Sequence, residues 1–120
     1  MKFYEFSQNN TGGSFDVDEH VCHRLFIEAD DVTMATDIAI NLGVYFNGVA
    51  RDMDCPCCGD RWYEQWVDGI SFPYKYSDTQ IFDDVESYAQ YLADDWGWTS
   101  PDARIFYKNG LMKEIFSKKV

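Results

Sequence analysis

Three of the four cysteines lie within four positions, in the run Asp54-Cys55-Pro56-Cys57-Cys58-Gly59. Cys55 and Cys58 can bind one Zn²⁺ together, because the proline restricts the turn between them and Gly59 lets the chain leave at dihedral angles that other residues avoid. The run therefore predicts one half of a tetrahedral zinc site. Two further ligands must come from elsewhere in the chain.

The remaining sulfur and imidazole groups are gathered at a second position. Cys22 is the fourth cysteine, and the only two histidines, His20 and His23, lie on either side of it. If residues 20–24 already form a strand, His20 shares a face with Cys22; if the strand begins at residue 24, adjacent Cys22 and His23 can both turn inward. We favour His23, because the residues before it form a polar loop, and keep His20 as the alternative. The predicted zinc ligands are Cys22, His23, Cys55 and Cys58.

Cys57 occupies the middle of the cysteine run and is expected to point away from the metal. A site that uses it in place of the histidine is a further alternative, but neighbouring Cys57 and Cys58 would then have to converge on one ion. Four protein ligands leave no position open for a catalytic water, so we expect the zinc to hold the fold rather than to do chemistry. The His-x-Glu signature of the zinc deaminases is also missing from the sequence.

A dithiol redox protein is the main competing interpretation of the same cysteines. Cys55-Pro56-Cys57-Cys58 also fits the C-P-x-C motif of glutaredoxin-like proteins, in which the start of a helix lowers the pKa of the first thiol. Gly59 argues against this role. Such a motif runs directly into a helix, whereas Gly-Asp-Arg before Trp62 predicts a turn followed by an extended segment.

Paired acids at 30–31, 83–84 and 94–95 could divide the roles of general acid and base. The first two pairs are explained by helix N-termini, which prefer negative charge, and the third is expected to be solvated. The sequence contains no nucleophile motif, glycine-rich phosphate loop or His-Glu-x-x-His helix. We therefore predict that the protein is not an enzyme.

The charge is distributed unevenly along the chain. The formal net charge is −11, with −14 in residues 1–107 and +3 in residues 108–120. Because an acidic surface repels phosphate backbones and anionic membranes, we expect no direct binding to nucleic acid or membrane, and a basic or neutral protein partner. A more specific alternative is an acidic DNA mimic that inhibits a nucleic-acid-binding protein.

The length predicts a single domain over residues 1–120, able to bury about two thirds of the surface that its unfolded chain exposes. There is no signal-like segment and no apolar run long enough to span a membrane. Cysteines this crowded would gain little from disulfide bonds, so we expect a reducing cytoplasm.

Aromatic residues are abundant, with nine Phe, eight Tyr and four Trp. Most should pack the core of so small a domain. Some flank the cysteines or the end of the second helix and exceed what packing requires, so they are also candidates for a protein interface. These residues are Trp62, Tyr63, Trp66, Trp96 and Trp98.

Alternating apolar residues predict several strands. They are expected at residues 2–7, 24–29, 44–46, 104–107 and 111–116. Two more extended segments, 62–67 and 72–76, are separated by an Asp-Gly turn and could form a hairpin. Asn109-Gly110 between the last two runs predicts another hairpin.

Two helices are predicted between these strands. One begins at Asp30 or Asp31 and ends at Leu42, and the other follows the capping pair Asp83 and Glu86 and runs to about residue 96. The expected fold is an α+β domain, in which two helices cover a mainly antiparallel sheet as in a ferredoxin-like variant, with one structural zinc site.

Three segments resemble a group of small proteins encoded by tailed bacteriophages. They are the run from Val21 to Ala29, the helix that ends in Gly43-Val44-Tyr45-Phe46, and the run from Asp54 to Trp62, about half the chain together. The resemblance implies a phage accessory protein, found in the host cytoplasm or in the virion, and implies no particular activity. We therefore expect a non-enzymatic zinc-binding protein that binds a host or virion protein, with a structural virion protein as a further alternative.

Overall fold

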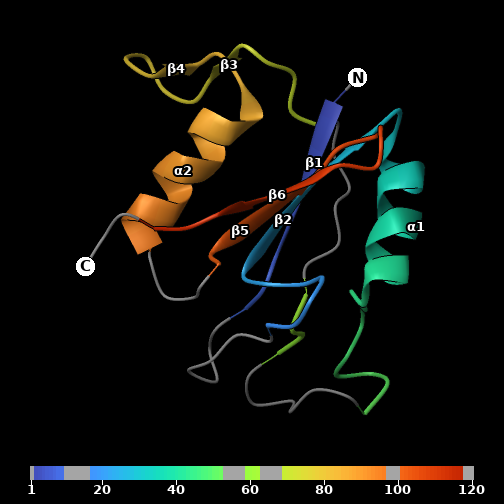
Figure 1. Ribbon diagram of the computed structural model, residues 1–120. Helices are drawn as coiled ribbons and strands as arrows, with labels where there is room; N and C mark the ends of the chain where they lie inside the picture. Colours follow the sequence, from blue (N-terminus) through green and yellow to red (C-terminus); the bar gives the residue numbers. More distant parts are fainter. Residues whose placement is uncertain (1, 10–16, 53–58, 63–68, 97–100, 118–120) are drawn as a thin grey trace.

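The computed structural model describes residues 2–9, 17–52, 59–62, 69–96 and 101–117. Its main element is a four-stranded mixed sheet in the order β1-β2-β5-β6 (Figure 1). The central strands β2 and β5 are parallel, and the two outer pairs are antiparallel. The strands are β1 (Lys2–Ser7), β2 (Arg24–Ala29), β5 (Ala103–Phe106) and β6 (Met112–Ile115).

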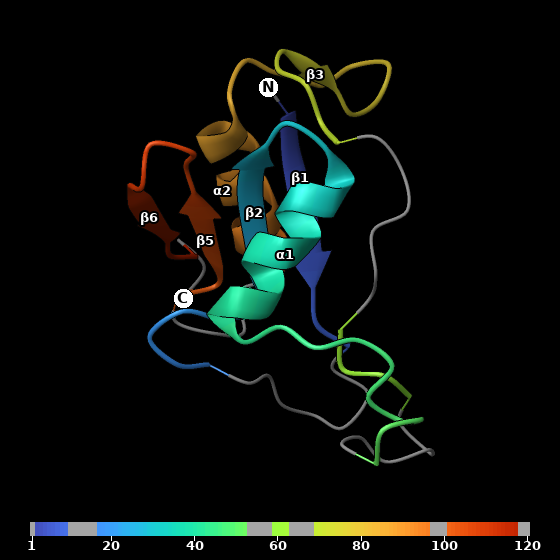
Figure 2. The same cartoon turned by 90° about the vertical axis from the view of Figure 1, so that its right-hand side faces the viewer.

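Helices α1 (Val32–Leu42) and α2 (Val85–Trp96) lie on opposite faces of this sheet (Figure 1). Figure 2 shows α1 in front of β1 and β2, with α2 behind the sheet. Side chains alternate along β2, so this strand packs against both helices. Leu25 and Ile27 belong to the apolar cluster that contains α1 residues (the α1 cluster), and Phe26 belongs to the cluster that contains α2 residues. Coverage of both faces explains why five of the six residues of β2 are buried.

The α+β class with two covering helices is confirmed. The sheet is mixed: two of its three pairings are antiparallel, as expected, and the third is parallel, because the predicted strand 24–29 pairs with the strand that begins at Ala103. The ferredoxin-like variant is not confirmed, and the two helices do not share a face of the sheet.

Both predicted ends of α1 and the predicted C-terminal end of α2 are confirmed, but the predicted capping pair of α2, Asp83 and Glu86, is wrong. Asp31 caps α1 by accepting a hydrogen bond from the backbone N–H three residues further on, at 2.8 Å. Gly43 ends α1 in the left-handed conformation, with a φ of 114°. Asp84, not Asp83, caps α2 in the same way at 2.7 Å, and this backbone hydrogen bond lowers the pKa of the Asp84 carboxyl.

The prediction of a strand at residues 44–46 is wrong. These residues follow Gly43 in an irregular conformation, and Val44 and Phe46 are buried in the α1 cluster. Their apolar pattern therefore arises because the side chains of an irregular segment pack into the core. Among the described residues, the segment does not pair with a neighbouring strand.

The two predicted hairpins have different outcomes. The one around Asn109-Gly110 is confirmed as the antiparallel pair β5–β6. In the other region, residues 63–68 lie outside the described residues, and β3 (Tyr74–Lys75) pairs with β4 (Ile81–Phe82), a strand that the sequence did not predict. This small two-stranded sheet lies above the start of α2 (Figure 1).

Aromatic rings fill the space between α2 and the sheet. Tyr88 on α2 lies 6.0 Å from Phe26 of β2 and 5.2 Å from Tyr74 of β3, measured between ring centroids. Phe72 and Phe82 surround the same ring. Burial raises the pKa of Tyr88 above its ordinary value. Much of the high aromatic content therefore belongs to this core, as expected for a small domain.

Replacing Phe26 with alanine should lower the free energy of unfolding by about 3–5 kcal/mol, because it removes a fully buried ring from the centre of the sheet. Phe116→Ala removes the same atoms from a residue that is 51% exposed, so it should change stability by no more than about 0.5 kcal/mol. Urea denaturation followed by circular dichroism measures both. Equal losses in the two variants would contradict the packing described.

Candidate metal centre

The end of the sheet where β2 begins is buried and polar. Every buried polar or charged residue in the described part of the chain lies there, on β1, β2, β5 or the segments that join them. They are Gln8, His23, Arg24, Asp102 and Arg104. In the described residues, no buried side-chain nitrogen or oxygen atom lacks a hydrogen-bond partner. This end of the sheet is therefore held by polar contacts as well as by apolar packing.

Asp102, directly before β5, is the centre of this cluster. Its carboxylate accepts a hydrogen bond from Arg24 Nη1 at 2.5 Å on one oxygen, and His23 Nδ1 lies 3.4 Å from the other. Its backbone is fixed as well, because its N–H donates to the carbonyl of Ile115 and its own carbonyl accepts from the N–H of Arg24. A fully buried carboxylate is thus held by main-chain bonds on both sides and shared between two side chains.

The ion pair continues outward across β1. Arg24 Nε lies 3.7 Å from Glu5 Oε2 on the neighbouring strand. Burial raises the pKa of Glu5, and the charge of Arg24 partly offsets that effect. Arg24 therefore lies between two carboxylates, which explains how a guanidinium is tolerated at the first position of a central strand.

Cys22 is fully buried in the α1 cluster, and its thiol donates a hydrogen bond to the carbonyl of Arg24 at 3.3 Å. Burial raises the pKa of this thiol to about 12. Without a metal it is a neutral group at pH 7, whereas a bound Zn²⁺ takes the thiolate. Its burial argues against a role as an exposed reactive thiol.

Gln8, at the end of β1, fixes the backbone of both predicted ligands. Its N–H donates to the carbonyl of His23 at 3.0 Å, and its side-chain amide donates to the carbonyl of Cys22 at 2.7 Å. Because both carbonyls accept a hydrogen bond from Gln8, the backbone that carries the Cys22 and His23 side chains is fixed in position.

The chain that follows the cysteine run reaches the same place. The N–H of Asn9 donates to the carbonyl of Arg61 at 2.7 Å, its side-chain amide donates to the carbonyl of Asp60 at 3.3 Å, and Gln8 forms an isolated bridge with Trp62. Residues 59–62 thus lie against residues 8 and 9, next to the backbone that holds Cys22 and His23. Gly59 has a φ of 83°, the left-handed exit that its place after the cysteines predicts.

The two candidate histidines have different surroundings. The His23 side chain is 8% exposed and faces Asp102, whereas that of His20 is 52% exposed and lies 3.7 Å from Glu19. The loop that carries His20 is shaped by Asp18, whose carboxylate accepts from the N–H groups of Val21 and His20. These hydrogen bonds lower the pKa of Asp18.

The other predicted ligands, Cys55 and Cys58, and the alternative ligand Cys57 lie outside the described residues. Among the residues that are described, no three His, Cys, Asp or Glu side chains form a group that could hold a metal ion. Two of the four predicted ligands lie outside those residues, so the zinc site stays a prediction.

The aromatic candidates for an interface are divided in the same way. Trp62 is 2% exposed and belongs to the α1 cluster, so the structure assigns it to the core rather than to the surface. Trp96 is the last residue of α2. Tyr63, Trp66 and Trp98 lie outside the described residues.

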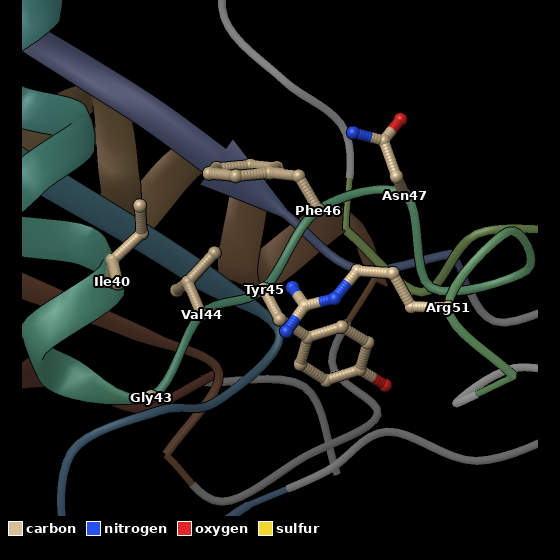
Figure 3. Close-up of a pocket in the computed structure, with 7 residues that line it drawn as sticks. All are labelled: Ile40, Gly43, Val44, Tyr45, Phe46, Asn47 and Arg51. Carbon is tan, nitrogen blue, oxygen red and sulfur yellow. The ribbon is translucent and has the colours of Figure 1, made fainter.

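A hollow of about 470 Å³ lies beside the C-terminal end of α1, with Ile40 at one side and Arg51 at the other (Figure 3). Its walls come from the irregular residues after Gly43, chiefly Val44, Tyr45 and Phe46. The described residues that line it include no carboxylate or imidazole. They therefore offer an apolar surface with one cation rather than an acid–base pair.

A family model described as a domain of unknown function (DUF7296) matches residues 1–120. The chain belongs to the DUF7296 family. No curated protein and no solved structure matches it. In the part of this DUF7296 protein that the structure describes, no helix is long and apolar enough to cross a membrane.

The sequence interpretation missed Asp102, Gln8 and the ion pair of Arg24. One signal was available, because an arginine at the start of the apolar run Arg24-Leu25-Phe26-Ile27 needs a buried anion if that strand is central. The sequence of this DUF7296 protein does not indicate which acidic residue pairs with Arg24, because Asp102 follows Pro101 in a polar segment that has the composition of a solvated loop.

Arg24→Met should lower the free energy of unfolding by about 3–5 kcal/mol, because it leaves the buried Asp102 carboxylate without its cation. The double variant with Asp102→Asn should recover part of that loss. Lys108→Met, which breaks the exposed pair with Asp30, is the matched control and should cost about 1 kcal/mol or less. Denaturation of the four proteins at pH 7 gives the comparison, and an Arg24→Met variant as stable as the control would refute the account.

Proposed function

We propose that this DUF7296 protein is a zinc-stabilised, non-enzymatic domain that acts by binding another protein. The proposed ion is held by Cys22, His23, Cys55 and Cys58. The observation that carries the proposal is the contact of residues 59–62 with Gln8 and Asn9, while Gln8 itself holds the backbone of Cys22 and His23. The exit of the cysteine run and the first two ligands therefore share one end of the sheet.

The chemistry of the described ligands suits a structural zinc. Cys22 and His23 are both buried, so an ion bound there is shielded from water, and a buried thiolate needs the positive charge that zinc supplies. Between α1 and β3 the described residues form no helix or strand of more than an isolated bridge. A metal that ties this long connection to the start of β2 would stabilise a segment whose described residues form no regular helix or strand.

The zinc content of cysteine variants tests this ligand set. Cys22→Ser and Cys58→Ser should each lose the metal and much of the stability, because a structural zinc can contribute on the order of 10 kcal/mol. Cys57→Ser is the matched control within the same run and should keep one zinc per chain. Metal analysis after gel filtration and thermal unfolding by circular dichroism measure both effects. Loss of zinc from Cys57→Ser but not from Cys58→Ser would show that the ligand assignment is wrong.

The proposed partner surface is the outer edge of β6. This strand ends the four-stranded sheet, and within the described residues it pairs only with β5. Met112 in this strand is exposed, as are Leu111 and Phe116 on either side of it, and the sequence from 108 to 120 has a net charge of +3 in an otherwise acidic chain. An open edge with apolar side chains can accept an extended segment of another protein, and the resemblance to phage proteins suggests a host or virion component.

A photo-reactive amino acid at Met112 should form one discrete cross-linked product in infected host cells, because this position lies on the open edge of the sheet. The same group at Asp37, an exposed position on α1, is the control and should give none. Mass spectrometry of the products identifies the partner. No product from position 112, or equal products from both positions, would contradict binding at this edge.

A further inference from the structure

We propose that Asp102 is a positioning residue for the metal, which orients the His23 ring so that it binds through Nε2. This inference rests on the proposed zinc site and adds a partner that lies outside the ligand set. It is carried by the contact between His23 Nδ1 and Asp102 Oδ1 at the buried end of the sheet.

The direction of this hydrogen bond fixes the tautomer of the ring. An ionised carboxylate can only accept, so the hydrogen must be on Nδ1 of His23. A neutral imidazole with its hydrogen on Nδ1 has its lone pair on Nε2, and only that nitrogen can bind zinc. Histidine ligands commonly donate their second ring N–H to a carboxylate in this way, which orients the ring and raises its basicity.

Asp102 is suited to hold the ring because it is itself immobilised. Arg24 binds Oδ2, which leaves Oδ1 to face His23, and the guanidinium balances the carboxylate charge. The backbone of Asp102 is held by Ile115 on β6 and by Arg24 on β2. The 3.4 Å separation is longer than a usual N–H···O hydrogen bond, and the proposal includes a shorter contact with Oδ1 when the ring binds a metal.

His20 has a different partner. Among the described residues, its ring is paired with Glu19, whose side chain is 84% exposed and can therefore adopt other rotamers. The same geometry thus selects His23 over His20 as the nitrogen ligand, a choice that the spacing of the two residues around Cys22 leaves open.

The test is a Co²⁺ titration of the metal-free protein, followed by the visible absorption bands of the bound ion. In Asp102→Asn the amide oxygen should stay with Arg24, which turns the NH₂ group toward Nδ1 and forces the ring hydrogen onto Nε2. We expect Co²⁺ to bind 10–100-fold more weakly than to the unmodified protein. Glu114→Gln, which removes a carboxylate that binds Arg104 without contacting His23, is the matched control and should change the affinity no more than about twofold.

The outcomes separate this inference from the proposed zinc site. If the unmodified protein binds one Co²⁺ and Asp102→Asn binds it equally tightly, the role of Asp102 is wrong and the zinc site stands. If the unmodified protein binds no Co²⁺, both fail. A second measurement needs no variant to fold: in the ¹¹³Cd-loaded protein with ¹⁵N-labelled histidine, the metal should couple to Nε2 of His23, and coupling to Nδ1 or to His20 would overturn the inference.

Discussion

The buried carboxylate of Asp102 is the constraint on which the rest of the structure depends. A charge removed from water costs several kcal/mol unless it is paired, so Asp102 requires Arg24, which lies 78 residues away in the chain. The pair joins the start of β2 to the start of β5, and these two strands form the one parallel pairing in the described sheet. Once that register is set, side chains alternate along β2 so that each face has its own apolar layer, and a helix covers each.

The same carboxylate links the fold to the proposed function. Its second oxygen faces His23, whose neighbour Cys22 is buried in the α1 layer and whose backbone is held by Gln8. The segment that leaves the cysteine run lies against Gln8 and Asn9, so the polar end of the sheet is where a metal would connect the two parts of the chain. In the proposed function, the metal stabilises this end of the domain and the partner protein binds at the outer edge of β6, which pairs only with β5 among the described strands.

The sequence predicted the features that depend on neighbouring residues. Asp31 and Gly43 mark the ends of α1 because capping and left-handed exit are local chemistry, and Asn109-Gly110 specifies its hairpin for the same reason. It did not predict the parallel pairing of β2 with β5 or the placement of the helices on opposite faces, since both depend on contacts between distant segments. The predicted strand at 44–46 was wrong because burial beneath a loop and burial in a sheet give the same apolar pattern.

The residues of the candidate site also differ in how far the sequence alone could identify them. Cys22 and His23 were identified because thiols and imidazoles are rare in this chain; both are buried at one end of the sheet, and their role as ligands stays a prediction. Asp102 was one of many acidic residues and could be recognised only from its neighbours in space. Native mass spectrometry before and after a strong chelator, with circular dichroism on the same samples, tests the central claim most directly. The account predicts one zinc per chain and loss of the folded structure when it is removed; a folded, metal-free protein with two reactive thiols would contradict it.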